Sequence, residues 1–166
     1  MSTNAIIGTT AGEGFRGRYC HWDGYPTWMG PQLASVVHDL CDGDAARAVE
    51  ILTVEHAGWS NIDTRPGKQE LPDGYRDGRF ASVPGVGIAY TIESGQTSED
   101  EWYVFPGSDL GSAEWAYAFD LEAGRLCVFR IPYGADPIYA GSVQTSGLWL
   151  MSDDQWGEIE GSTVPA

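Results

Sequence analysis

The stretch from Arg18 to Gly30 constrains the fold most, because closely spaced turn residues in it separate a predicted strand from a predicted helix. Residues 15–21 have the pattern of the second strand of a hairpin. Asp23-Gly24 tolerates a positive φ angle, and Pro26 favours an extended backbone in the residue before it. Pro31 suits the first turn of a helix, where its missing N–H group is not needed. The stretch therefore predicts a strand-to-helix connection.

Six side chains of this connection form the candidate ligand-binding site. Tyrosine and tryptophan bury a large apolar body and need one hydrogen-bond partner each, which is typical of a packed corner. The same side chains on a loop held by a rigid scaffold are typical of a binding cleft. We favour the corner, because buried aromatic residues belong to a core more often than to a ligand platform. The six residues are Tyr19, His21, Trp22, Asp23, Tyr25 and Trp28.

His21 and Asp23 are the best candidates for acid–base chemistry in this group. They are two residues apart at a strand end, so both side chains can point to one side and the carboxylate can orient the imidazole. A structural hydrogen bond is the commoner purpose of such a pair, and no catalytic residue is assigned. Cys20 adjoins His21, so on a strand the two point to opposite faces and cannot form a nucleophilic pair.

The residues around this connection also carry a resemblance. Tyr-Cys-His-Trp-Asp-Gly-Tyr-Pro at 19–26 follows a short strand ending in Ile6-Ile7-Gly8 and precedes a leucine-bearing helix. This resembles a family of small, uncharacterised proteins encoded by bacteriophages, prophages and some bacterial genomes, which share a His-Trp-Asp-Gly-Tyr-Pro signature. The later stretches 102–105 and 115–120 resemble the Trp/Tyr-rich hairpin of that family. The resemblance is close over residues 1–30 and loose beyond, and it implies an origin but no activity or catalytic residues.

The net charge of −15, from 24 acidic and 9 basic residues, limits the partners of the chain. Direct nucleic-acid binding needs lysine and arginine to neutralise phosphates, so we do not expect it. The acidity is compatible with a soluble surface, with mimicry of nucleic acid, or with adaptation to high salt. Most acidic residues lie in predicted loops, where acids are usually just solvated, and this argues against mimicry.

Several other site types have no support in the sequence. No apolar run is long enough to span a membrane, and residues 1–10 lack the features of a signal peptide, so we expect a cytoplasmic protein without a membrane partner. The irregular spacing of Cys20, Cys41 and Cys127 favours reduced thiols. No metal-binding motif and no complete dinucleotide fingerprint is present, so we expect neither a metal nor a cofactor.

The hydrophobic pattern predicts one α+β domain over residues 1–166, a length sufficient for a single core. A mainly antiparallel sheet should carry an N-terminal hairpin, with two adjacent helices packed on one face. Small residues at Ala116 and Ala118 should let a helix approach their face of a strand. The predicted elements are strands at 4–10 and 15–21, helices at 31–41 and from Asp44 to near Gly58, a long irregular loop at 59–85, strands at 86–92, 101–105, 114–119, 125–131 and 139–143, and a loose C-terminus at 162–166.

These observations favour a non-enzymatic phage or prophage accessory protein. It would bind a host or phage protein through an acidic, aromatic-rich surface. The first alternative is a small-molecule-binding or hydrolytic protein with a cleft at His21–Pro26. The second alternative is an inhibitor that mimics nucleic acid. The sequence predicts no oligomeric state.

Overall fold

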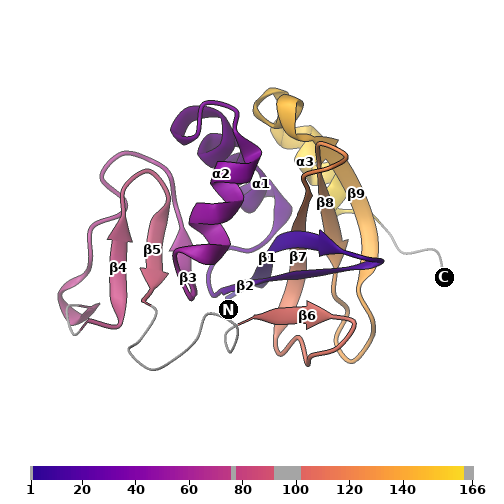
Figure 1. Ribbon diagram of the computed structural model, residues 1–166, viewed down its shortest axis with the longest axis horizontal. Coiled ribbons are helices and arrows are strands. Elements are labelled where there is room, and N and C mark those ends of the chain that lie inside the picture. Colours follow the sequence, from indigo (N-terminus) through magenta and orange to yellow (C-terminus); the bar gives the residue numbers. More distant parts are fainter. Residues whose placement is uncertain (1, 76–77, 92–101, 163–166) are drawn as a thin grey trace.

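The computed structural model describes residues 2–75, 78–91 and 102–162 of the 166-residue chain (Figure 1). Within these residues nine strands form one mixed sheet in which most neighbouring strands are antiparallel. Helices cover one face of the sheet, so the predicted α+β fold is confirmed. In chain order the elements, with η for 3-10 or π-helical segments, are β1 (Asn4–Ala11), β2 (Gly14–Cys20), α1 (Pro26–Ser35), η1 (Val36–Leu40), α2 (Ala45–Val49), η2 (Glu50–Val54), β3 (Gly58–Ile62), η3 (Asp73–Tyr75), β4 (Phe80–Val83), β5 (Gly87–Tyr90), β6 (Tyr103–Phe105), β7 (Ala113–Asp120), β8 (Arg125–Arg130), β9 (Ile138–Gln144), η4 (Thr145–Leu150) and α3 (Asp153–Glu160).

The predicted N-terminal hairpin lies at the centre of the sheet. β1 and β2 pair in the antiparallel direction, from Ala5 opposite Cys20 to Ala11 opposite Gly14. On its other edge β1 pairs with β7 in the parallel direction. β2 divides the sheet, because its first residues pair with β6 and its last residue, Cys20, pairs with Trp59 of β3. The strand order is therefore β4-β5-β3-β2-β1-β7-β8-β9, with β6 beside β2.

The first helix begins earlier than the sequence predicts. We expect it over 31–41 from the sequence, whereas α1 begins at Pro26 and contains Pro31. Either proline fits a first helical turn. Glu160, near the other end of the chain, decides between them, because its carboxylate accepts hydrogen bonds from the backbone N–H and the hydroxyl of Thr27. This carboxylate satisfies the free donors of a helix that starts at Pro26.

The connector between the two predicted helices agrees with the sequence. Asp42 and Gly43 both have positive φ angles, and the first helical segment ends before them. Asp44 is the predicted N-cap of α2, and its carboxylate accepts a 3.0 Å hydrogen bond from the backbone N–H of Arg47. α2 continues through η2 to Val54 and lies next to η1, so the two helical segments are neighbours, as predicted.

The prediction of one long irregular loop over 59–85 is corrected at both ends. β3 occupies Gly58–Ile62 and β4 occupies Phe80–Val83, and both pair with β5. Both strands are short, and the prolines and Asp-Gly pairs between them obscure the alternating pattern that identifies strands. The irregular part is therefore limited to the chain between these two strands.

The C-terminal helix α3 is missing from the predicted elements. A capping box starts this helix: the Ser152 hydroxyl accepts from the backbone N–H of Gln155, and the Gln155 side chain accepts from the backbone N–H of Ser152. Trp156 of α3 is fully buried against α1. The predicted loose C-terminus at 162–166 lies outside the described residues, apart from its first residue.

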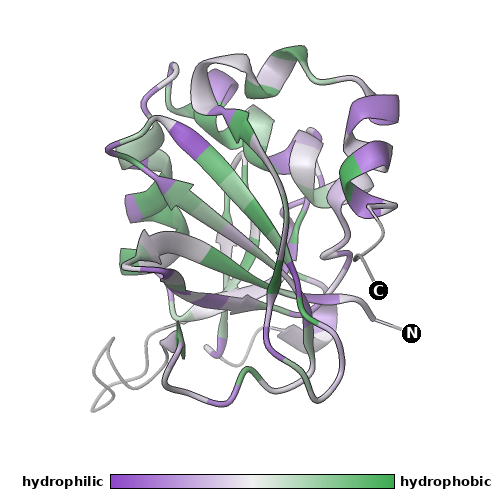
Figure 2. Ribbon diagram, turned by 90° about the vertical axis from the view of Figure 1, so that its right-hand side faces the viewer, coloured by the Kyte–Doolittle hydropathy of each residue, from purple (hydrophilic) through white to green (hydrophobic). Residues whose placement is uncertain are grey.

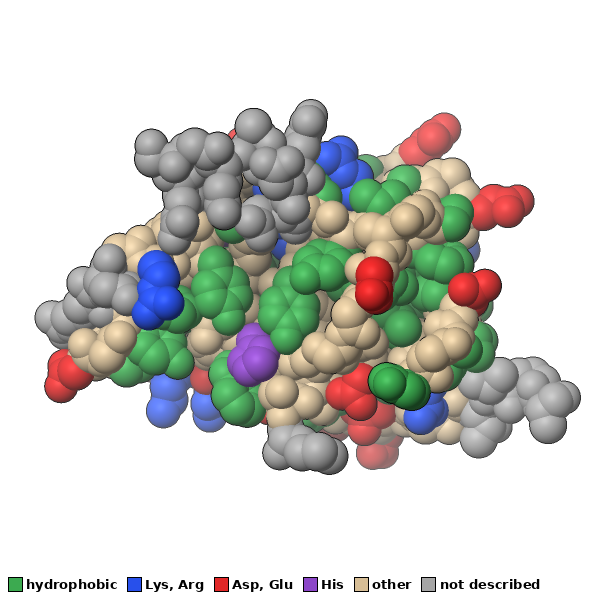
Figure 3. Space-filling model, turned by 90° about the horizontal axis from the view of Figure 1, so that it is seen from below, with side chains coloured by type: hydrophobic (Ala, Val, Ile, Leu, Met, Phe, Trp, Pro, Cys, Tyr) green, Lys and Arg blue, Asp and Glu red, His purple; other side chains and the backbone are tan. Residues whose placement is uncertain are grey.

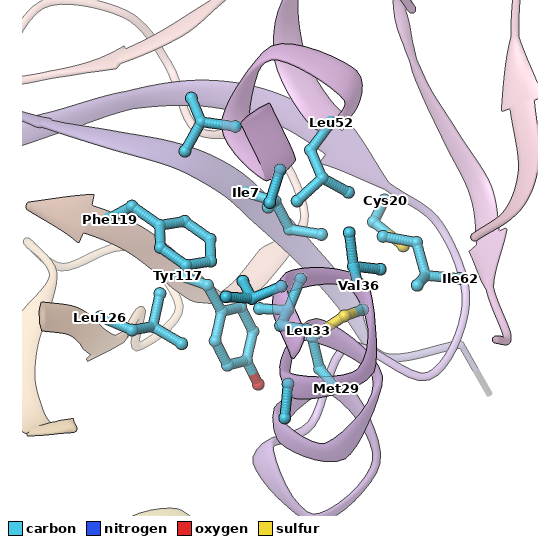
Figure 4. Packing of buried hydrophobic residues seen from close by; sticks show 14 of the residues in the cluster. Ile7, Cys20, Met29, Leu33, Val36, Leu52, Ile62, Tyr117, Phe119 and Leu126 are labelled. Atoms are coloured by element: carbon cyan, nitrogen blue, oxygen red, sulfur yellow. The ribbon is translucent and has the colours of Figure 1, made fainter. Parts of the chain in front are cut away.

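The helices pack on the opposite face of β7 from the one predicted. The sequence suggests that Ala116 and Ala118 face a helix, but the helices cover the face of Tyr117 and Phe119 (Figure 4). The alanines belong to a smaller hydrophobic cluster on the other face, which also contains Phe15. Hydrophobic residues therefore dominate the central strands, which bury both faces (Figure 2).

Candidate functional site

Backbone contacts with the start of β1 hold the signature turn in place. Gly24 donates its N–H to the carbonyl of Thr3 at 2.8 Å, and its own carbonyl accepts the hydroxyl of Tyr117 at 2.6 Å. A Cβ atom on Gly24 would lie only 2.7 Å from the Cβ of Ala5, so this position needs glycine. Asp23 has a φ angle of 56°, which aspartate adopts more readily than most residues. This half of the signature builds a packed corner.

Trp28 and Tyr25 belong to the same corner. The indole N–H of Trp28 donates to the carbonyl of Ile62 at 3.0 Å, and the guanidinium of Arg65 lies 5.2 Å from the ring centroid. Tyr25 is the N-cap residue of α1. Burial raises the pKa of its hydroxyl, and the nearby charges of Asp23 and Glu160 add to that rise. Trp28 therefore anchors α1 to β3, and Tyr25 forms the start of α1.

Tyr19 and His21 form a different group on the other side of the connection. The Tyr19 hydroxyl and His21 Nδ1 are 2.9 Å apart, and the His21 and Trp22 rings meet edge to face at 4.7 Å. The side chain of Asp23 is exposed and makes no hydrogen bond to any described residue. The expected His21–Asp23 pair is thus replaced by a His21–Tyr19 pair, because the chain stays extended through His21 and turns at Asp23.

Tyr19 also belongs to a row of aromatic side chains that crosses the face of the sheet opposite the helices. Its neighbour Cys20 points into the helix-side core, so Tyr19 points to the other face. Ala89 and Tyr90 in β5 alternate in the same way. Figure 3 shows hydrophobic side chains gathered across this face. We call this row the aromatic belt; it consists of Tyr75, Phe80, Tyr90, Tyr19, Tyr103, Phe105, Phe15, Phe129 and Tyr139.

Most successive rings of the aromatic belt have centroids between 4.3 and 6.1 Å apart. Phe80 lies between Tyr75 and Tyr90, with ring centroids 4.3 and 5.3 Å apart. Where β3 crosses below the belt, Gly58 has no side chain, and a Cβ atom there would lie 3.4 Å from the ring of Tyr90. The ring of Tyr19 follows, 6.1 Å from that of Tyr103. The belt thus passes from the β4–β5 end of the sheet to its middle.

The second half of the belt runs from the middle of the sheet to its far edge. Phe15 lies between Phe105 and Phe129, at 5.7 and 5.2 Å, and Phe129 meets Tyr139 at 5.9 Å. Phe15 is buried, whereas Tyr139 at the end of the belt is 56 % exposed. The sequence reasoning identified Tyr19 alone as a site residue in this row. Period-two spacing within each strand was the available signal, but the order of the strands decides which rings meet.

A basin adjoins the second half of the belt. It has a volume of about 1210 Å³ and is lined by residues 2–4, 105–115 and 130–137. Phe105 belongs to both the belt and the basin. At the basin wall Asn4 Nδ2 donates to the Ser112 hydroxyl at 2.7 Å. Three exposed carboxylates line the basin, from Asp109, Glu114 and Asp136. The basin therefore places carboxylates beside the aromatic belt.

The three thiols of the chain are buried and free. Burial raises the pKa of Cys20 to about 12, so this thiol stays protonated and poorly nucleophilic near neutral pH. Among residues 2–75, 78–91 and 102–162, no three histidine, cysteine or acidic side chains are placed to hold a metal ion together. Within the same ranges, no helix combines the length and the hydropathy of a membrane span.

Comparisons with protein family models, with curated proteins and with solved structures found no match to this chain.

Proposed function

We propose that this protein is a phage or prophage accessory protein that acts by binding another protein through the aromatic belt. The observation that carries the proposal is the unusual placement of the rings: aromatic side chains, most of them partly exposed, cross one face of the sheet. Aromatic residues are enriched in protein interfaces, and contiguous apolar surface is rarely left uncovered. The signature resemblance supports the proposed origin.

The signature contributes to this surface only in part. Tyr19 lies in the belt, and His21 and Trp22 extend it at one side through the 2.9 Å hydrogen bond and the ring contact. Tyr25 and Trp28 instead hold α1 in the packed corner. A protein partner on the sheet face therefore accounts for the first group better than a cleft formed by all six residues.

Photocrosslinking at matched positions tests the proposal. A photoreactive amino acid would replace Tyr139, which is 56 % exposed at the end of the belt, or Trp149, which is 54 % exposed in η4 on the helix side. In a bacterial lysate we expect a discrete crosslinked species from position 139 and not from position 149, suppressed by excess wild-type protein. Equal crosslinking at both positions, or none at position 139, would contradict the proposal.

A further inference from the structure

We infer that the aromatic belt and the basin bind a proline-rich, extended protein segment whose one end is basic. The inference rests on the proposed function, because it names the class of partner for the same surface. Two observations carry it. Aromatic rings, several of them tyrosines, form a row across one face of the sheet. Exposed carboxylates line the basin that adjoins this row.

The row of rings suits a polyproline II helix. Such a helix has no internal hydrogen bonds, and proline has no N–H group, so its apolar rings can be buried against aromatic side chains at little desolvation cost. Its carbonyl groups remain as acceptors. Tyr90 and Tyr103 lie in the belt and carry hydroxyl groups that can donate to them. Aromatic-lined surfaces are a recurrent way of recognising such segments.

The carboxylates of the basin favour a basic flank on the bound segment. Asp109, Glu114 and Asp136 are exposed at the basin, and none of them forms an ion pair with another described residue. Arg130 is the one cation among the residues that line the basin. In Figure 3 the acidic side chains lie mainly on the right half of this face, among and around the hydrophobic side chains. A lysine or arginine at one end of the proline run would therefore find unneutralised carboxylates.

The net charge also favours a basic protein segment over two other partners, a nucleic acid and a second copy of this chain. A nucleic acid could stack its bases on a row of rings, but its phosphates would be repelled by a chain of net charge −15. A second copy of this chain would bring the same charge again. A basic segment is attracted by the whole molecule, which raises the rate of encounter as well as the affinity.

Calorimetric titration with a synthetic peptide tests the inference. The probe is a peptide in which two arginines precede a run of prolines, and its control replaces the prolines by alternating glycine and serine. We expect the proline peptide to bind and the control peptide to bind at least tenfold more weakly. Tyr139→Ala should weaken the proline peptide several-fold, whereas Trp149→Ala, at a position of similar exposure outside the belt, should not.

A second pair of variants tests the role of the carboxylates that line the basin. Asp109→Asn with Glu114→Gln should weaken the arginine-bearing peptide and reduce the salt dependence of its binding, while Asp153→Asn with Asp154→Asn in α3 should change neither. Melting temperatures of all variants show whether each is folded. Equal binding of both peptides, equal effects of belt and control variants, or no binding at all would overturn the inference. If position 139 still crosslinks a partner in that case, the proposed function stands and only the partner class fails.

Discussion

Asp63 shows how one residue ties the irregular segment after β3 to the signature corner. Its two carboxylate oxygens accept from the Arg65 guanidinium at 3.0 and 2.8 Å, and its backbone N–H donates to Val86. The same guanidinium lies over the ring of Trp28. Asp63 is only 7 % exposed. The bidentate pair therefore fixes both the direction of the chain beyond β3 and one wall of the corner.

We predict that Asp63→Asn lowers the free energy of unfolding by about 1–2 kcal/mol at neutral pH. The hydrogen bonds from Arg65 hold the pKa of the Asp63 carboxyl below its ordinary value. This group therefore stabilises the fold above the unfolded-state pKa of about 3.9, and the stabilisation is lost as the pH falls through the lower folded-state pKa. Urea unfolding at pH 7 and near pH 2 measures the difference between wild type and variant, which should shrink at the lower pH.

Asp39→Asn is the matched control for this prediction. The hydrogen bond from His38 also lowers the pKa of Asp39, but its side chain is largely exposed to solvent. Water screens such a pair, so the substitution should change stability by less than about 0.5 kcal/mol. Similar losses for the two variants would show that burial of the Asp63 carboxylate is not what makes its pair with Arg65 stabilising.

At the scale of elements, the contact between α1 and α3 depends on one glycine. A Cβ atom on Gly30 would lie 2.3–2.5 Å from three ring atoms of Trp156, and that ring is fully buried. Gly157 lies in α3 on the other side of the same contact, but a Cβ atom there would meet only the Thr27 methyl group, at 3.9 Å. Packing thus requires glycine at position 30, whereas position 157 has room for a larger side chain.

We predict opposite effects of alanine at these two positions. Gly30→Ala should destabilise the protein by about 1–3 kcal/mol, because the Trp156 ring must move in a packed core. Gly157→Ala should stabilise it by roughly 0.5–1 kcal/mol, because alanine is the better helix former and the site has room. Thermal and urea unfolding measure both. A neutral Gly30→Ala variant would mean that α3 is not held against α1 as described.

The sequence predicted the helix boundaries that depend on residues close to them in the chain. Asp44 caps α2, and Asp42 and Gly43 end the preceding helix, because the responsible contacts or backbone angles lie within a few residues. The start of α1 was not predictable in this way. It depends on the carboxylate of Glu160, which is 133 residues from Thr27 in the chain. A local pattern offers two prolines and no means of choosing between them.

The candidate site, too, could be predicted only where its contacts join residues close together in the sequence. The pairing of Tyr19 with His21 follows from strand alternation, and the structure brings them to 2.9 Å. The belt as a whole needs the order of the strands, in which Tyr19 of β2, Phe80 of β4 and Tyr139 of β9 share one face. That order includes the parallel pairing of β1 with β7, and no short-range pattern specifies it.

At the scale of the whole molecule, the excess of acidic residues is a continuing source of repulsion. The ion pairs between described residues involve few cations: Arg47 contacts Glu50 and Glu55, Arg65 contacts Asp63, and His38 lies beside Asp39. Most of the acidic residues that the structure describes have no such partner. Self-repulsion of this kind opposes compact folding.

We predict that salt stabilises this protein and that the effect depends on net charge. Screening becomes effective once the Debye length falls to about 10 Å, near 0.1 M salt, so the melting temperature at pH 7 should rise between very low salt and that concentration and then level off. At pH 4.2, the isoelectric point calculated from the sequence, repulsion no longer dominates and the rise should disappear. Calorimetric scans at both pH values, with sodium chloride as the only variable, measure the effect. An equal rise at both pH values would point to exclusion of salt from the protein surface instead of charge screening. A basic partner bound at the carboxylates of the basin would relieve the same repulsion locally, so the salt-induced rise at pH 7 should be smaller for the complex than for the free protein.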